Sequence, residues 1–432
     1  MNFDSPIYSM DKDKSSQPEN SIISTLKQIS YYSGGNFIAQ IVMMIYAIIV
    51  ARALGPTQLG IYSGLYAVLG TSISLVNFGY DIWILKETNR HNNLRELSGE
   101  VISLKLALGG LWSLLIFTLL YSTQSEIYTA SLILMALGDT LSDRLLNTVI
   151  AAWNIDRSIK RINTAILSSR IFKLILLLGL IFTNQVSLNL IVGSRFLVSL
   201  VVLLISFLVL KPIIKVPSFK RVLSSVKSSY EFGLSEILSV IYGNIDIVIL
   251  SYFSTLGTGY YSPASGIVHA LFIIPNSFYT YLLPKYAKMN FVENKQQAKS
   301  TFNKIILSFS LIGLLMSLCV FLGGDVLVST VLGPSYDFTG RLLTILSPIL
   351  LIKSISFGLA LIIVISGQQK YRLLPQFLVS LLTIILCLIF IPISGVNGVA
   401  LIYVVGEFLL MIYYWIIVKK FAYGHSKTRN LK

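Results

Sequence analysis

Lys and Arg are distributed unevenly between the long apolar runs of this chain, gathering in every second gap. Of its 34 Lys and Arg residues, only Arg52 and Arg341 lie in the intervening gaps. In membrane proteins, the short loops on the cytoplasmic side are enriched in these two residue types. The pattern therefore predicts a multi-pass membrane protein with an even number of spans and with both termini in the cytoplasm.

The apolar runs are long enough to cross a bilayer, which takes about 20 residues of α-helix. Hydrophobic residues make up 54% of the chain, and charged residues 12%, about half the charged fraction of a typical soluble domain. We predict an all-α integral membrane fold with about twelve transmembrane helices. The expected spans are residues 31–53, 60–84, 99–121, 128–152, 163–184, 188–210, 231–253, 260–284, 303–323, 343–366, 373–392 and 397–418.

The net charge of +15 does not indicate a nucleic-acid partner, because the basic residues are separated by apolar spans. We expect them to orient the chain and to contact anionic lipids. Cys319 and Cys387 lie within spans and lack the spacing of metal ligands, and no motif for ATP hydrolysis or nucleophilic catalysis is present. We therefore expect a protein that is not an enzyme and that needs no metal or cofactor. Because residues 1–20 are polar, we expect no cleavable signal peptide there.

A short motif occurs at equivalent positions in the two halves of the chain. Residues Gly60-Ile61-Tyr62-Ser63 open the second span, and Gly259-Tyr260-Tyr261-Ser262 open the eighth. Since six spans separate the copies, both halves enter the membrane in the same direction, which predicts two parallel six-helix bundles around a central cavity. The expected parts are a cytoplasmic N-terminal segment (1–30), an N-terminal bundle (31–210), a cytoplasmic linker (211–230), a C-terminal bundle (231–418) and a basic cytoplasmic tail (419–432).

Ionisable side chains within the predicted spans are candidates for function, because an unpaired charge in hydrocarbon is costly. Lys105 lies close enough to the inner surface for its amine to reach the headgroups, so we assign it a structural role. The cations that we predict to bind substrate are Arg144, Arg170, Lys173, Arg195 and Lys353.

Arg170 and Lys173 form the closest pair of these cations, since their spacing places them on one helix face. Their neighbours on the same helix include no acid, so the two charges repel each other unless an anion lies between them. One candidate is the carboxylate of Asp139 or Asp143, which share a face of the preceding span. The other is a phosphate-bearing substrate in a hydrated cavity. The sequence leaves both open.

Four further groups are candidates for coupling ion flow to transport, because a protonatable side chain beside a transport path can bind and release a proton. For the acids, the alternative is a partner for a cation or a backbone donor. For the histidine, the alternative is a hydrogen-bonded structural residue. The candidates are Asp139, Asp246, Glu407 and His269.

The segment Ala51–Ser63 (ARALGPTQLGIYS), followed by Asn77–Asp81 (NFGYD), resembles the start of bacterial polysaccharide exporters. These are lipid-linked oligosaccharide flippases of the multidrug/oligosaccharidyl-lipid/polysaccharide superfamily. The Asp246 region with Gly259–Ala264, and the stretch Val331–Tyr336, are also similar to this family. The first span lacks a central aspartate, so ion coupling through an acid at that position is not expected.

The resemblance implies a V-shaped pair of six-helix bundles in the bacterial cytoplasmic membrane. Such a protein flips undecaprenyl-pyrophosphate-linked oligosaccharides outward by alternating access, for O-antigen, capsule or exopolysaccharide synthesis. The expected partners are this lipid-linked substrate, membrane lipids, and a polysaccharide polymerase and glycosyltransferases of the same pathway.

Three other functions remain open on the sequence alone. A multidrug-type exporter of small organic cations would favour an acid-dominated cavity. An integral-membrane polysaccharide polymerase or ligase would need a large outer loop for its catalytic groups, and the outer gaps are short. A scaffold that transports nothing would leave the charges near the membrane midplane unexplained.

Overall fold

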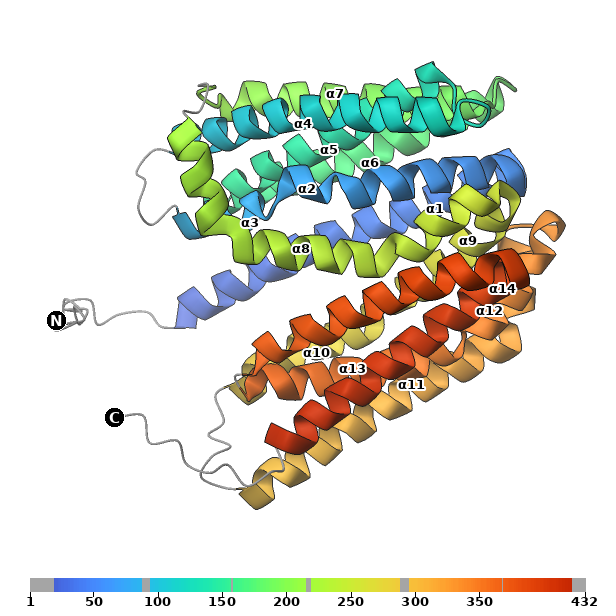
Figure 1. Ribbon diagram of the computed structural model, residues 1–432. Coiled ribbons are helices and arrows are strands. Elements are labelled where there is room, and N and C mark those ends of the chain that lie inside the picture. The colour runs from blue at the N-terminus through green and yellow to red at the C-terminus, as the bar shows by residue number, and fades with distance from the viewer. Residues whose placement is uncertain are drawn as a thin grey trace, which may run out of the picture.

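The computed structural model describes residues 19–87, 94–156, 158–214, 219–287, 295–366 and 368–421, and these ranges are helical apart from short connections (Figure 1). Much of the expected N-terminal segment and of the basic tail lies outside them. The helices are α1 (Glu19–Ser72), α2 (Ser74–Asn77), α3 (Tyr80–Glu87), α4 (Leu94–Gln124), α5 (Ala130–Ile155), α6 (Ile159–Phe182), α7 (Leu188–Leu210), α8 (Phe219–Phe253), α9 (Thr255–Leu271), α10 (Ile273–Ala287), α11 (Lys295–Val331), α12 (Asp337–Leu346), α13 (Pro348–Ile365) and α14 (Leu373–Phe421), with 3₁₀ turns η1 (Pro334–Tyr336) and η2 (Gln369–Arg372).

Within the described ranges, nine helical segments are long and apolar enough to cross a membrane. Two of them, Gly34–Ile84 and Leu373–Lys420, have more than twice the length that one crossing needs. Each contains a glycine with a positive φ angle, 70° at Gly55 and 58° at Gly395, a conformation that glycine adopts readily. Figure 1 shows both segments reversing direction at the end of the molecule opposite to the termini. The all-α membrane fold is thus confirmed, while the number twelve stays a prediction.

Helix α8 begins well before the expected start of its span at residue 231. Residues 219–230, which the sequence assigns to a cytoplasmic linker, are helical and continuous with the span. Helix α8 contacts α14 of its own half and also α1, α2 and α3 of the other half. It therefore packs against both groups of helices.

The two copies of the repeated motif pack against each other. A Cβ atom on Gly60 would lie 1.7 Å from the carbonyl oxygen of Thr255, and a Cβ atom on Gly259 would lie 1.7 Å from that of Pro56. These two contacts relate equivalent residues of the two copies, as expected around a local two-fold axis. Only glycine permits so close an approach of α1 and α9. The predicted repeat therefore appears in space as a symmetric contact between the halves.

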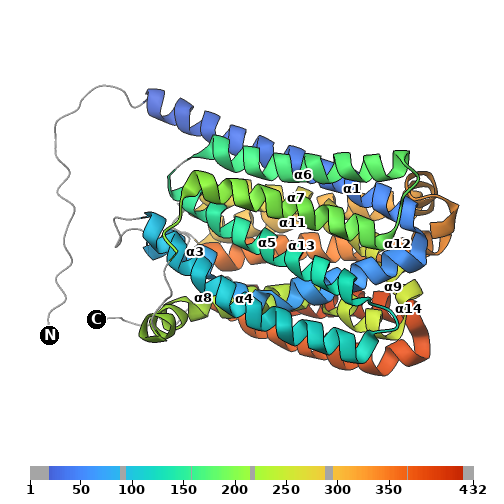
Figure 2. The same ribbon diagram turned by 90° about the horizontal axis from the view of Figure 1, so that it is seen from above.

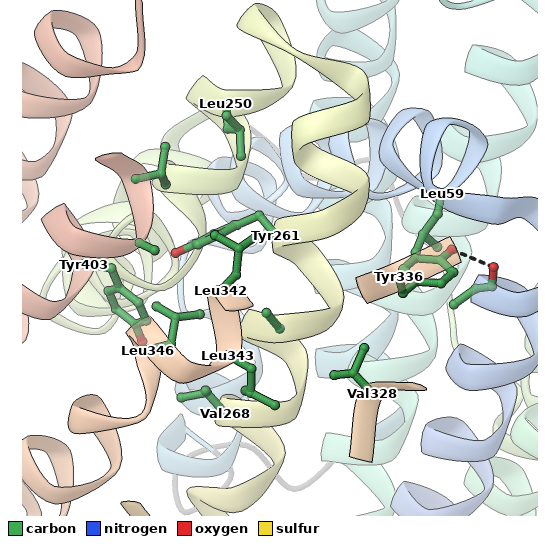
Figure 3. Packing of buried hydrophobic residues seen from close by; sticks show 14 of the residues in the cluster. Leu59, Leu250, Tyr261, Val268, Val328, Tyr336, Leu342, Leu343, Leu346 and Tyr403 are labelled. Carbon is green, nitrogen blue, oxygen red and sulfur yellow. Dashed lines mark hydrogen bonds between the residues drawn. The ribbon is translucent and has the colours of Figure 1, made fainter. Parts of the chain in front are cut away.

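Further contacts join the halves at this end of the molecule. Ser262 Oγ donates to Ser63 Oγ over 2.9 Å, and Tyr336 Oη donates to the carbonyl oxygen of Ala51 over 2.6 Å (Figure 3). Arg52, one of the two cations in the outer gaps, donates to two backbone carbonyls at the end of α11. Tyr336 belongs to a cluster of buried hydrophobic residues, and Leu59 lies beside it (Figure 3). The same cluster includes Leu250, Tyr261, Val268, Val328, Leu342, Leu343, Leu346 and Tyr403.

Toward the end that carries both termini, helices α10, α11, α13 and α14 diverge from α2–α7 (Figure 1). Both views show the long helices running side by side between these two ends of the molecule (Figures 1 and 2). The halves thus meet at the turns that contain Gly55 and Gly395 and separate toward the termini.

The expectation that the Lys105 amine reaches the membrane surface is wrong. Lys105 is 0% exposed, and its Nζ atom donates to Asp81 Oδ1 over 2.6 Å, to Asn77 Oδ1 over 2.5 Å and to Thr148 Oγ1 over 2.8 Å. The side-chain amide of Asn77 donates in turn to Glu236 Oε1 in α8 over 2.6 Å. The amine therefore satisfies its bonding capacity inside the protein, because the bends between α1 and α3 bring polar partners within reach.

Candidate functional site

Asp139, near the middle of α5, is the centre of a buried ionic cluster. Its Oδ2 atom accepts hydrogen bonds from Tyr66 Oη over 2.7 Å and from Arg195 Nε over 3.0 Å. Its Oδ1 atom accepts from Ser199 Oγ over 2.6 Å and lies 3.5 Å from Lys173 Nζ. Removing a carboxylate from water is costly unless it gains close cations and hydrogen bonds. This geometry supplies both, from helices α1, α6 and α7.

Lys173 is shared between two carboxylates. Its Nζ atom lies 3.3 Å from Asp143 Oδ1 and 3.4 Å from Oδ2 of the same group, in addition to its contact with Asp139. The two acids are one helical turn apart on α5, as their spacing predicts. The Asp143 side chain is 34% exposed, whereas that of Lys173 is buried. In this conformation, carboxylates therefore provide the anion that the Lys173 charge requires.

Arg195 is held by aromatic rings as well as by Asp139. Its guanidinium carbon lies 4.3 Å from the ring centre of Tyr66, 5.6 Å from that of Tyr62 and 5.9 Å from that of Tyr46. It also donates to the hydroxyl oxygen of Tyr62. Cation–π contacts of this kind stabilise a charge that has lost its water. These tyrosines were not among the predicted site residues, although Tyr62 belongs to the repeated motif and Tyr66 follows it by one helical turn.

Within the described chain, Arg144 and Arg170 lack the carboxylate partners that Lys173 and Arg195 have. Both side chains are half-buried, in α5 and α6 respectively. Over the described ranges, neither guanidinium forms an ion pair or a side-chain hydrogen bond. The two acids of the cluster offset the charges of Lys173 and Arg195. Arg144 and Arg170 are therefore half-buried cations whose charge no ion pair offsets among the residues that the structure describes.

The second half contains a separate ion pair between Lys353 of α13 and Glu407 of α14. The Lys353 amine also lies 4.8 Å from the ring centre of Tyr242 and 5.8 Å from that of Phe272. Glu407 is buried, and its Oε2 atom has no hydrogen-bond partner among the residues that the structure describes. The ion pair is therefore shielded from solvent, but one oxygen of its carboxylate lacks a hydrogen bond within the described ranges.

The remaining coupling candidates are hydrogen-bonded within the second half. Asp246 accepts a 2.5 Å hydrogen bond from Tyr261 Oη and a 2.9 Å bond from a backbone N–H. Within the described chain it forms no salt bridge. The Nε2 atom of His269 lies 3.1 Å from Tyr403 Oη. These contacts match the structural alternatives in the sequence analysis, and the coupling roles stay predictions.

None of the five cations predicted to bind substrate lines the cavity between α6 and α7. This cavity has a volume of about 670 Å³, and its charged wall residues are Lys160 and Arg161. The predicted central cavity lined by cations therefore stays a prediction.

Comparison with known protein families gives one match that covers more than half of the chain. Residues 25–290 match the family model described as polysaccharide biosynthesis protein. No curated protein sequence matches the chain.

Three solved structures illustrate the fold. An inward-facing multidrug resistance MATE family transporter of the MOP superfamily has a TM-score of 0.72 at 15% identity, covering 90% of this chain and 96% of that one. The lipid II flippase MurJ, in an inward closed conformation, has a TM-score of 0.70 at 14% identity, covering 90% and 87%. An outward-facing MATE family transporter has a TM-score of 0.60 at 15% identity, covering 92% and 96%. At such identities the likeness shows a shared fold.

Proposed function

The chain belongs to the polysaccharide biosynthesis protein family, and from this premise we propose that it is a multi-pass membrane transporter and propose its cargo. The proposed cargo is an undecaprenyl-pyrophosphate-linked oligosaccharide repeat unit for a surface polysaccharide. The protein moves it across the bacterial cytoplasmic membrane, with both termini in the cytoplasm. The polymerase and glycosyltransferases of that pathway are its proposed partners.

The observation that supports this cargo most directly is that Arg144 and Arg170 are half-buried and form no ion pair within the described chain. A diphosphate cannot enter hydrocarbon without compensation for its lost water. Arginine is suited to provide it, because its planar guanidinium donates two parallel hydrogen bonds to phosphate oxygens. Arg170 lies one turn from Lys173, so a phosphate bound to Arg170 would compete with the acids of α5 for the Lys173 amine.

We propose alternating access as the mechanism, with residues 31–210 and 231–418 as the moving bundles and 211–230 as the link between them. The halves are in close contact around Gly60 and Gly259 and diverge toward the termini. The higher TM-score against an inward-facing transporter than against an outward-facing one agrees with this shape. The contact must open for the cargo to leave on the outer side.

Among the coupling candidates, we favour Glu407 as the group that exchanges an ion. Asp139 is neutralised by two cations, whereas Asp246 and His269 already have hydrogen-bonded partners. Glu407 has one cation partner, Lys353, and keeps one oxygen without a hydrogen bond in the described chain. Release of Lys353 toward cargo would leave a buried carboxylate that must bind a cation or a proton.

The test of the cargo proposal is the double variant Arg144→Gln with Arg170→Gln, expressed in a strain lacking the native gene. We expect export of polysaccharide to be lost and lipid-linked sugar to accumulate on the inner leaflet, while the amount of protein in the membrane is unchanged. The matched control is Arg341→Gln, an exposed arginine of α12 with no ion pair among the described residues. Normal export by the double variant would show that the cargo phosphate is bound elsewhere.

The other functions are less well supported. Half-buried arginines without an acid partner would repel an organic cation, which disfavours a multidrug-type exporter. The outer connections at residues 125–129, 183–187 and 332–336 are short. They cannot contain the catalytic domain that a polysaccharide polymerase or ligase would need.

A further inference from the structure

Helices α6 and α7 form an apolar groove on the surface of the first half. The cavity of about 670 Å³ lies between them. Its wall includes Phe172, Leu176, Leu197 and Val201, whose side chains are 37% to 55% exposed. Arg170 does not line it. The groove therefore opens toward lipid and is distinct from the proposed cargo cations.

The end of this groove nearest the termini is basic. Lys160 and Arg161 line the groove itself. A second cavity of about 380 Å³ shares Arg161 and Val209 with it and adds Arg95 and Asp156. Together, the walls of the two cavities thus contain three cations and one acid where the apolar groove meets the membrane surface. This combination suits a molecule with an anionic head and an apolar chain.

A buried donor without a partner lies at the same end. Trp153 of α5 lines the groove and is 2% exposed. Its indole Nε1–H has no hydrogen-bond acceptor among the described residues. Buried indole N–H groups usually find one. Because the Nε1 atom itself is covered, a phosphate or ester oxygen beside Lys160 would supply the acceptor only after neighbouring side chains move.

The length of the groove matches one leaflet of a bilayer. From Arg161 to Leu176, α6 rises about 22 Å at about 1.5 Å per residue. Half of a bilayer with its headgroups measures about 20–22 Å. Beyond Leu176, a cavity of about 560 Å³ continues the groove, and none of its wall residues is charged. The basic end is therefore specific to the leaflet on the side of the termini.

We propose that this groove binds an anionic phospholipid of the cytoplasmic leaflet, with its phosphate at Lys160 and Arg161 and one acyl chain between α6 and α7. Basic pockets between helices near the cytoplasmic surface bind anionic lipid headgroups in the same way. The leaflet assignment uses the orientation proposed above, whereas the binding itself is independent of the cargo. The site thus accepts a lipid that is not transported.

The test uses quenching of tryptophan fluorescence by a phospholipid brominated close to the glycerol. The full-length protein is reconstituted into vesicles that contain either brominated phosphatidylglycerol or brominated phosphatidylcholine. The contribution of Trp153 is the difference between the wild type and Trp153→Phe. We expect phosphatidylglycerol to quench this contribution at an affinity on the order of tenfold higher than phosphatidylcholine.

The variant Lys160→Gln with Arg161→Gln should remove this preference and leave quenching by phosphatidylcholine unchanged. The matched control, Lys419→Gln with Lys420→Gln, removes two adjacent cations near the end of α14 and should keep the preference. Equal quenching by both lipids in the wild type would overturn the proposal. So would displacement of phosphatidylglycerol by equimolar undecaprenyl phosphate, which would assign the groove to the apolar tail of the cargo. Normal lipid selectivity in a variant that does not export would separate the two proposals.

Discussion

Among single residues, some contacts of the charged side chains in the first half could be predicted from the sequence and others could not. Helical spacing placed Asp139 and Asp143 on one face of their span, and Arg170 and Lys173 on one face of the next. The carboxylate partner of Lys173 could therefore be named as one of two alternatives. The tyrosines around Arg195 could not be named, because they come from a distant part of the sequence and the spacing within one helix does not determine how two helices face each other.

Replacing Asp139 should be far more damaging than replacing Asp246. The variant Asp139→Asn removes a buried charge that two cations need, and breaking such a pair costs about 3–5 kcal/mol. In Asp246→Asn, the amide oxygen can still accept the hydrogen bond from Tyr261, so a loss within about 1 kcal/mol is expected. The measurement is the midpoint of thermal unfolding of each purified variant in the same detergent. Similar midpoints for both would show that the cluster around Asp139 contributes little to stability.

At the scale of helices, most of the expected spans are helical in their middles and differ from the structure at their ends. Two of them are interrupted near the centre: the span 60–84 at Ile73, where α1 ends, and the span 260–284 at Phe272, between α9 and α10. Helix α7 has the same bounds as its predicted span, whereas α8 and α11 begin earlier than the apolar runs. Their first residues are rich in basic and polar side chains, and hydrophobicity alone does not show that such residues continue a helix. The bend at Gly55 is a second case, because a turn was expected there but its backbone conformation could not be predicted.

The close approach of α1 and α9 leads to a prediction at this scale. In Gly60→Ala, the new Cβ atom would meet a backbone oxygen of α9 at 1.7 Å, so the helices must move apart. Overpacking of this kind typically costs about 1–3 kcal/mol. We expect a lower unfolding midpoint, measured by the loss of monodisperse protein after heating.

Gly70→Ala is the matched control for that variant. Gly70 lies in the same helix, and a Cβ atom there meets nothing within 4 Å. Alanine is about 1 kcal/mol better than glycine in a helix interior, so the midpoint should stay the same or rise. A fall of equal size in both variants would mean that the contact between α1 and α9 is not the cause.

For the whole molecule, the sequence predicted the membrane class and the two-fold repeat, and the structure brings the two copies of the repeat together. The sequence could not show that the copies touch, because a repeat fixes the direction of each half and not the distance between them. It also could not give the conformation, in which the halves meet at one end and diverge at the other (Figure 1).

A disulfide bond that holds the two copies of the repeat together should stop transport. We start from a protein in which Cys319 and Cys387 are replaced by Ala, and introduce Ser63→Cys with Ser262→Cys. The two hydroxyl oxygens lie 2.9 Å apart, close enough for a disulfide after a small adjustment. Oxidation should block export of polysaccharide, and a reductant should restore it.

The single variant Ser63→Cys, in the same background, should export under both conditions. Continued export by the fully oxidised pair would show that the contact stays closed throughout the cycle, against alternating access about this point. Failure of the pair to cross-link would place the two serines farther apart in the membrane than in this structure.

The contact between Ser63 and Ser262 also bears on how such a chain could arise. Each half presents a serine to its own counterpart and a glycine to an equivalent backbone carbonyl, so the surface is complementary to itself. Two separate half-length proteins with this surface could have paired as a parallel homodimer without any linker. Gene duplication and fusion would then have preserved an old dimer interface, and the divergence of the ionic residues in the two halves would have followed once both copies were held in one polypeptide.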